Sequence, residues 1–201
     1  INAQIYAGTR INPIAGDQVG SPSASDTTGT TNTAQSNGRA NTAAAIGNGT
    51  HGYAIDATNF GAMTAGQISV VGTAQGMGVR TDAALSANAG DLTLSSNGDL
   101  TVGSHAAQQD VSITSAGNAT LSGTGLGVGE YKLSAGGDVT STGTLQSGTN
   151  LSVAAGGNAN LAALQANGNA SATAGSSLTL NTSQTGGALT LATLGRNAGT
   201  I

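Results

Sequence analysis

The chain has 201 residues, of which 7% are charged and 2% aromatic, with 33 glycines, no cysteine and a formal net charge of −4. So small a net charge predicts no attraction to nucleic acid or to an anionic membrane, and the lack of cysteine excludes disulfides, thiolate zinc sites and thiol chemistry. No apolar run approaches the roughly 20 residues of a membrane-spanning helix, so we expect no membrane insertion. Large apolar side chains are scarce, which favours a fold that buries small residues in thin layers.

The first part of the chain, residues 1–89, has β-strand character with irregular spacing. Residues 1–11 contain three isoleucines and are expected to form a strand or two. Residues 12–52 are rich in Thr, Asn, Ser and Gly and hold both prolines, so we predict a long surface excursion there. Residues 67–71 and 77–80 are predicted strands separated by a glycine turn.

From Gly90 onward a short phrase recurs. It consists of glycine, then an acid or amide, then alternating apolar and polar residues, as in Asp91-Leu92-Thr93-Leu94. Its copies start at residues 91, 99, 110, 118, 130, 138, 150, 158, 169, 177 and 188. The steps between successive starts are alternately short and long: the short step is the same in every repeat, and the long step varies by one residue. Two strands at a fixed offset, followed by a longer connection, therefore make up each repeat.

The pattern inside each copy is that of a strand with one buried face. The two apolar positions of the eleven copies hold Leu, Val, Ile, Ala or Tyr everywhere except Ser141, and the residue between them is Thr, Ser, Lys or Asn. Such alternation has the period of a β-strand. Leu126, Leu145 and Leu164 recur at equal intervals of one repeat and predict a third inward column. The predicted fold is all-β, a right-handed parallel β-helix (solenoid) with coils of about 19–20 residues.

Glycine precedes the start of eight of the eleven copies. We expect these glycines to let the backbone turn through positive φ.

Acids and amides form two columns in this fold. The first column holds Asp91, Asp110, Glu130, Asn150 and Asn169, and the second holds Asp99, Asn118, Asp138 and Asn158. A catalytic pair needs two carboxylates at a defined separation in a cleft. Here acids and amides are interchangeable along each column, just after a turn glycine, so we predict turn caps that bond nearby backbone.

We expect no catalytic residue, no metal ligand and no cofactor. Only Gly136-Gly137-Asp138 approaches the phrase of calcium-binding β-rolls. His51 and His105 are isolated from one another in the sequence. Asn-x-Ser/Thr triplets occur at Asn48, Asn118, Asn150, Asn169 and Asn181; chance in an Asn- and Thr-rich chain and glycosylation both account for them.

One outward column is a candidate ligand-facing surface. A nearly regular polar ladder is predicted from Thr101, Thr120, Thr140, Asn160 and Thr179. A flat ladder of this kind is suited to bind a glycan, another sheet or ice. The alternative, which we favour, is a hydrated face that resists aggregation at strand edges.

Residues 53–102 resemble the filamentous haemagglutinin family, the secreted proteins of bacterial two-partner secretion, which includes contact-dependent growth inhibition proteins. Tyr53-Ala54-Ile55-Asp56-Ala57, Phe60-Gly61-Ala62-Met63-Thr64-Ala65-Gly66-Gln67-Ile68 and Gly76-Met77-Gly78-Val79-Arg80 are similar to the end of that family's secretion domain, and the Gly-Asp-Leu-Thr-Leu phrases to its haemagglutinin repeats. The resemblance implies that residues 1–89 end a secretion-type β-helix domain, with an irregular excursion at 12–52, and that residues 90–201 are haemagglutinin-repeat coils. Members of this family carry asparagine-proline signatures that their outer-membrane transporter recognises, and Asn12-Pro13 does not lie in such a phrase.

The resemblance implies a structural role on the bacterial cell surface. The expected function is that of a rod segment in a secreted adhesin, a virulence factor, or in a contact-dependent toxin-delivery filament, and not of an enzyme. Expected partners are an outer-membrane two-partner transporter for the parent protein and a glycan or receptor on a host or neighbouring cell. One alternative is a glycan- or receptor-binding surface on the β-helix itself, and another is a polysaccharide-cleaving β-helix enzyme, by analogy of fold alone.

Overall fold

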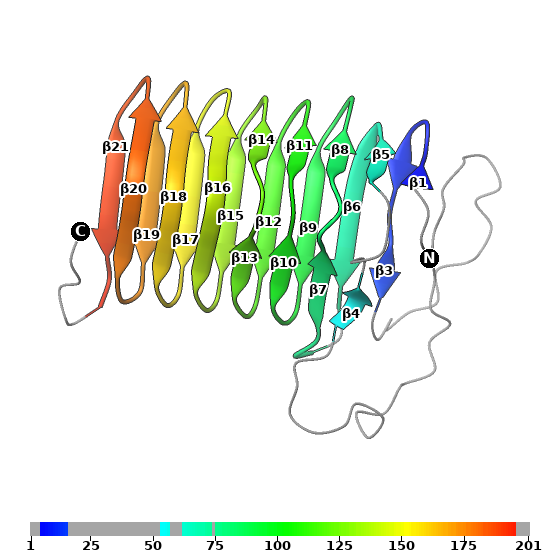
Figure 1. The fold of residues 1–201 in the computed structure, drawn as a ribbon, viewed down its shortest axis with the longest axis horizontal. Coiled ribbons are helices and arrows are strands. Elements are labelled where there is room, and N and C mark those ends of the chain that lie inside the picture. Colours follow the sequence, from blue (N-terminus) through cyan, green and yellow to red (C-terminus); the bar gives the residue numbers. More distant parts are fainter. Residues whose placement is uncertain (1–4, 16–52, 57–61, 74, 196–201) are drawn as a thin grey trace.

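The chain forms a parallel β-solenoid in a computed structural model, which describes residues 5–15, 53–56, 62–73 and 75–195. Every strand pair among these residues is parallel, and none of them lies in a helix. The strands stand side by side from β1 at one end to β21 at the other (Figure 1). The predicted all-β parallel β-helix is therefore confirmed.

Each complete coil has three faces, which we number so that the chain passes from face 1 to face 2 and then to face 3. Face 3 is a sheet of β2 (Arg10–Ile11), β3 (Ile14–Ala15), β6 (Gln67–Gly72), β9 (Leu92–Ser96), β12 (Val111–Ser115), β15 (Tyr131–Ala135), β17 (Leu151–Ala155), β19 (Ala170–Ala174) and β21 (Leu189–Thr193). Face 1, which the chain enters after face 3 of the coil before, contains β4 (Tyr53–Asp56), β7 (Gly78–Thr81), β10 (Leu100–Val102), β13 (Ala119–Leu121) and the first parts of β16 (Val139–Ser147), β18 (Ala159–Ala166) and β20 (Leu178–Thr185). Face 2 contains β1 (Ile5–Tyr6), β5 (Met63–Ala65), β8 (Leu85–Ala87), β11 (His105–Ala107), β14 (Gly125–Gly127) and the last parts of β16, β18 and β20.

The pairing register confirms the length of the repeat. Along face 3, Leu92 pairs with Val111 and Val111 with Tyr131, which are the intervals that the repeated phrase predicts. The same two intervals recur in every later coil of this face, whereas the step from Ile68 to its partner Leu92 is longer. The regular part of the solenoid therefore begins near Asp91, where the repeated phrase begins.

The core is a stack of thin layers of aliphatic side chains. Of the inward positions predicted from the repeated phrase, all up to Leu178 are buried, and the three that follow belong to the last coil described. The exception noted in the sequence, Ser141, is also buried, and its hydroxyl donates to the Gly143 carbonyl oxygen at 2.8 Å. A fully buried leucine or valine stabilises such a stack by about 1.5–3 kcal/mol.

The prediction of the third inward column is wrong at one residue. Leu145 and Leu164 are buried and paired, as expected, but Leu126 is 37% exposed. The residue paired with Leu145 is Gly125, the neighbour of Leu126. The interval from Gly125 to Leu145 is one residue longer than the interval from Leu126 to Leu145. Gly125 therefore takes the inward position, and Leu126 points outward.

The irregular first part confirms two predictions and corrects one. The strands expected at 67–71 and 77–80 are β6 and β7, and they flank Gly76, which has a φ of +73°. β1 and β2 are the strands expected within residues 1–11. Ile14–Ala15, which we assigned to the excursion, instead pairs with β6. The rest of the excursion, residues 16–52, lies outside the described residues.

Candidate functional site

The predicted polar ladder is formed on face 1. Its five members are paired in an unbroken series: Thr101 with Thr120, Thr120 with Thr140, Thr140 with Asn160, and Asn160 with Thr179. Thr120, Asn160 and Thr179 are exposed, whereas the other two are half-buried. Neighbouring strands lie about 4.8 Å apart, so the ladder offers a hydrogen-bonding group at this spacing along the long axis.

The chemistry of this ladder is limited to hydrogen bonding. Hydroxyl and amide groups donate and accept, but none of them titrates near neutral pH. The series continues into Arg80, which pairs with Thr101 and forms an ion pair with Asp82 at 3.0 Å. The ladder is therefore a neutral surface, and the ion pair of Arg80 and Asp82 follows it on the next strand.

The acid and amide columns cap turns, but not in the way that we predicted. Their side chains bond the backbone of the next coil instead of their own. In the second column, Asp99 Oδ1 accepts the Asn118 N–H at 2.8 Å, Asn118 Oδ1 accepts the Asp138 N–H at 2.8 Å, and Asp138 Oδ1 accepts the Asn158 N–H at 2.6 Å. The first column does the same from Asp91 to Asp110, from Asp110 to Glu130, from Asn150 to Asn169 and from Asn169 to Ala188.

Six of the eight glycines that precede a start serve these bonds, and our explanation by positive φ is wrong for the repeats. Among the described glycines only Gly76 has a positive φ. A Cβ at the glycine would instead overlap with the capping oxygen of the coil before it. This holds for Gly117 over Asp99, Gly137 over Asn118, Gly157 over Asp138, Gly129 over Asp110, Gly168 over Asn150 and Gly187 over Asn169.

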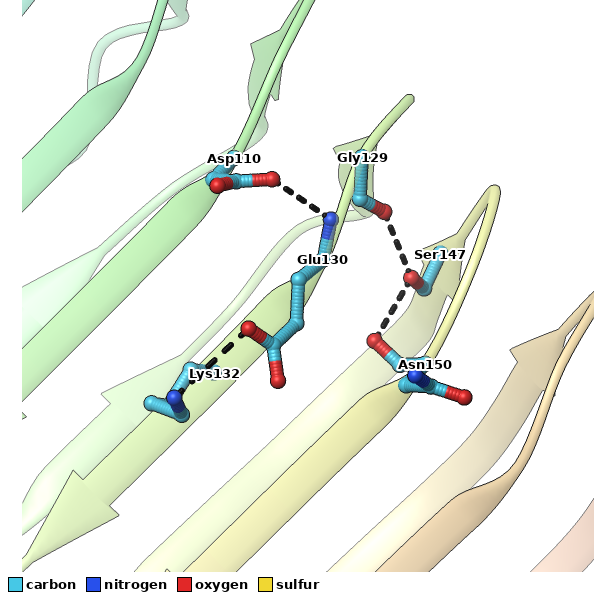
Figure 2. A network of polar contacts seen from close by, with 6 residues as sticks. All are labelled: Asp110, Gly129, Glu130, Lys132, Ser147 and Asn150. Carbon is cyan, nitrogen blue, oxygen red and sulfur yellow. Dashed lines mark hydrogen bonds and ion pairs between the residues drawn. The ribbon is translucent and has the colours of Figure 1, made fainter.

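Glu130 interrupts the first column (Figure 2). Its backbone N–H donates to Asp110 Oδ1 at 2.7 Å, but its own longer side chain turns toward Lys132, with 3.6 Å between Glu130 Oε2 and Lys132 Nζ. Ser147 closes the corner beside it: its Oγ lies 2.8 Å from the carbonyl oxygens of both Gly129 and Asn150, and its single proton is shared between them. The residue before Asn150 is then Thr149 instead of glycine.

The sequons of the repeats coincide with these caps. Asn118, Asn150 and Asn169 each use the side-chain oxygen to accept a backbone N–H of the next coil. Asn181 is exposed on β20, and Asn48 lies outside the described residues. In each capping asparagine the side-chain oxygen makes the bond to the next coil, and the side-chain nitrogen faces away from that bond.

The acids of the two columns are engaged by neighbouring groups. In the second column acids alternate with amides, whereas in the first column Asp91, Asp110 and Glu130 follow one another on successive coils; each capping acid accepts a backbone N–H, and Glu130 pairs with Lys132. Among residues 5–15, 53–56, 62–73 and 75–195, no three His, Cys, Asp or Glu side chains gather so that they would hold a metal ion. Within the same ranges there is also no helix of the length and hydropathy needed to cross a bilayer.

A buried polar pair was missed by the sequence reasoning. His105 and Tyr131 lie in the core, with 2.6 Å between His105 Nε2 and the Tyr131 hydroxyl and 2.8 Å between His105 Nδ1 and the Gly103 carbonyl oxygen. Burial lowers the pKa of His105 and raises the pKa of Tyr131. The signal in the sequence was the place of this histidine, one repeat after the inward Leu85 and one repeat before Gly125 in the same column.

Comparison of the chain with models of protein families, with characterised proteins and with solved structures finds no match.

Proposed function

We propose that this chain is a structural rod segment of a secreted bacterial surface protein, an adhesin or a contact-dependent toxin-delivery filament. One observation carries the proposal: the inward residues and the pairing register repeat from coil to coil along residues 91–178, with turn caps between most of the coils. A site for chemistry would need one coil that differs from the others in its outward groups. A rod needs only length and stiffness.

The bonding between coils supports stiffness. Each coil bonds to the next through the parallel ladders of three faces and through the caps at two corners. In such solenoids each repeat contacts only its neighbours, so stability accumulates with the number of stacked repeats. Bending the rod would break several of these bonds at once on one side.

The resemblance of residues 53–102 to the filamentous haemagglutinin family supports the rest of the proposal, namely secretion by an outer-membrane two-partner transporter and display at the bacterial surface. In this proposal the binding or toxic module belongs to other parts of the parent protein. The chain itself acts as a spacer and carries no enzyme activity.

Deletion of whole coils tests the rod. Removal of residues 150–168 or of residues 138–157 takes out one coil in register. We expect both shortened chains to fold, with an unchanged cross-section and a length reduced by about 4.8 Å in X-ray scattering. If one deletion unfolds the chain and the other does not, the coils are not equivalent and the spacer proposal is wrong.

The unbroken register of the polar ladder favours one second candidate, a neutral glycan bound along face 1. A glycan array with the intact chain tests it, with a triple variant of Thr120, Thr140 and Thr179 to alanine. The matched control changes Thr93, Thr114 and Thr173 on face 3 to alanine. Binding that only the face 1 variant loses supports this candidate, whereas an array without signal rejects it and leaves the rod.

A further inference from the structure

The pair of His105 and Tyr131 joins two successive coils inside the core. His105 begins β11 on face 2 and is 3% exposed, and Tyr131 begins β15 on face 3 of the next coil and is fully buried. Their rings are inclined at 41°, with centroids 5.8 Å apart. No other described coil has an aromatic or histidine pair of this kind in its interior.

The hydrogen bonds of the pair fix the protonation state of the histidine. The Gly103 carbonyl oxygen only accepts, so His105 Nδ1 carries the proton and donates it at 2.8 Å. His105 Nε2 is then bare and accepts the Tyr131 O–H at 2.6 Å. All of these buried polar groups are satisfied when the imidazole is neutral.

The strand that follows His105 in its column is shaped to admit the pair. Gly125 takes the inward position of β14 that pairs with His105. A Cβ at Gly125 would lie 2.5 Å from His105 Nε2 and 2.7 Å from the Tyr131 hydroxyl oxygen. Three positions in two coils, His105, Gly125 and Tyr131, are therefore matched to each other.

We propose that this matched pair is a pH-sensitive latch, which holds β11, β14 and β15 together at neutral pH and releases them ahead of the other coils in mild acid. A protonated imidazole has two donors and no acceptor. Its Nε2–H would then face the Tyr131 O–H, which loses its acceptor. The proposal is independent of the rod function.

Nothing that faces the imidazole would neutralise its charge. The inward side chains of β8, β10, β12, β13, β14 and β15 are apolar or glycine, apart from Ser115 and Tyr131. The charged side chains on or beside these strands lie at the outer surface: Asp82, Asp99, Asp110, Glu130 and Lys132. A buried charge without a partner is unstable, so the core opens to let water reach it.

The direction of the effect follows from linkage. Burial, only partly opposed by the bond to Gly103, lowers the pKa of His105 below the 6.5 of an exposed histidine. Between the lowered value and 6.5, the opened coils bind a proton that the closed coils do not. The opening equilibrium therefore rises up to about tenfold for each unit by which the pH falls below roughly 6.5, and is independent of this group above that pH.

Amide hydrogen exchange of the intact chain between about pH 7.5 and pH 5 tests the latch, after correction for the intrinsic exchange rate. We expect the amides of β11, β14 and β15 to lose protection by up to about tenfold per pH unit below roughly 6.5. Those of β17 and β19, which have no histidine, serve as the internal control and stay constant. Protection that falls equally in all coils, or in none, overturns the proposal.

A non-titrating variant separates the proton from the packing. His105→Gln keeps a donor and an acceptor but cannot become charged, so the pH dependence of β11, β14 and β15 disappears. Should this variant fail to fold, proton NMR of the His51→Gln chain follows the one remaining histidine. A midpoint below that of an exposed histidine that coincides with the loss of protection supports the latch, and an ordinary midpoint with constant protection overturns it.

Discussion

Two of the three corners of each coil have a fixed length, and the third does not. At these two corners the last inward residue of one face and the first inward residue of the next are four positions apart in every regular coil. Examples are Ser115 and Ala119 between faces 3 and 1, and Ser147 and Leu151 between faces 2 and 3. Between faces 1 and 2 the interval is three residues in some coils and four in others, with a bulge between Ser141 and Thr144. The fixed corners are those with capping acids and amides, and at the corner from Ser147 to Leu151, where Glu130 provides no cap, Ser147 Oγ bonds the Gly129 carbonyl oxygen of the coil before. The bonds between coils, more than the turns themselves, therefore set the length.

The largest expected effect on stability comes from inserting one residue at a corner of fixed length, compared with the same insertion at the variable corner. A glycine inserted between Gly157 and Asn158 breaks the cap from Asp138 and shifts every later strand against its neighbour. We expect it to lower the free energy of unfolding by more than about 4 kcal/mol.

A glycine inserted between Ala162 and Ala163 is the matched control. It gives this coil the four-residue interval that the preceding coil already has at the same corner, so we expect a loss below about 1 kcal/mol. Urea unfolding followed by circular dichroism measures both. Equal losses would show that the caps do not fix the corner.

The next test adds a Cβ where the caps leave no room. Gly137→Ala places a methyl group on Asn118 Oδ1, and overpacking of this kind costs about 1–3 kcal/mol. Gly90→Ala is the control, because a Cβ there meets its nearest neighbour at 3.4 Å, ordinary contact. We expect thermal unfolding to show a clear loss for the first variant and little change for the second.

A double-mutant cycle identifies the cause. If the methyl group clashes with the cap, Gly137→Ala costs less in a chain that already carries Asn118→Ala. Additive losses would instead mean that Gly137 is needed for its own conformation, which was our explanation from the sequence alone.

The sequence predicted the strands well because a period of two shows in the sequence wherever one face is buried. It predicted the glycines correctly as turn residues, but for the wrong reason. The oxygen that excludes a Cβ at Gly137 belongs to Asn118 in the preceding coil, and no local pattern shows that contact. Leu126 was misplaced for a related reason, since the variable corner between faces 1 and 2 shifts the register by one residue.

The buried pair could not be predicted because it depends on two columns that meet only in space. Tyr131 was recognised as an inward residue of its strand, and His105 was seen as isolated. Their contact requires the corner that brings β11 of one coil beside β15 of the next, and it requires a glycine at position 125. Sequence periodicity gives each column but not the distance between columns.

Removal of a single cap should have an intermediate effect. Asp138 Oδ1 accepts the Asn158 N–H at 2.6 Å and the Asn158 Nδ2–H at 3.2 Å. Asp138→Ala leaves that backbone donor without its partner, and we expect a loss of about 1–2 kcal/mol in urea unfolding. Asp138→Asn is the control, because Asn118 caps the neighbouring coil with an amide; a loss as large as that of alanine would mean that the charge is what matters.

The smallest expected effect is a gain in stability where the structure lacks a cap. Glu130→Asn with Thr149→Gly would rebuild, between these coils, the arrangement of Asn150 and Gly168 in the next coil. The exposed pair of Glu130 and Lys132 contributes little, and Thr149→Gly alone should cost about 0.5–1 kcal/mol in backbone entropy. Together they add one hydrogen bond between side chain and backbone, so we expect the double variant to exceed the sum of the single variants by about 1 kcal/mol. Thermal unfolding measures the three variants. Simple additivity would show that a glycine and an amide at these positions do not form a cap by themselves, and that Ser147 already performs this function at the corner.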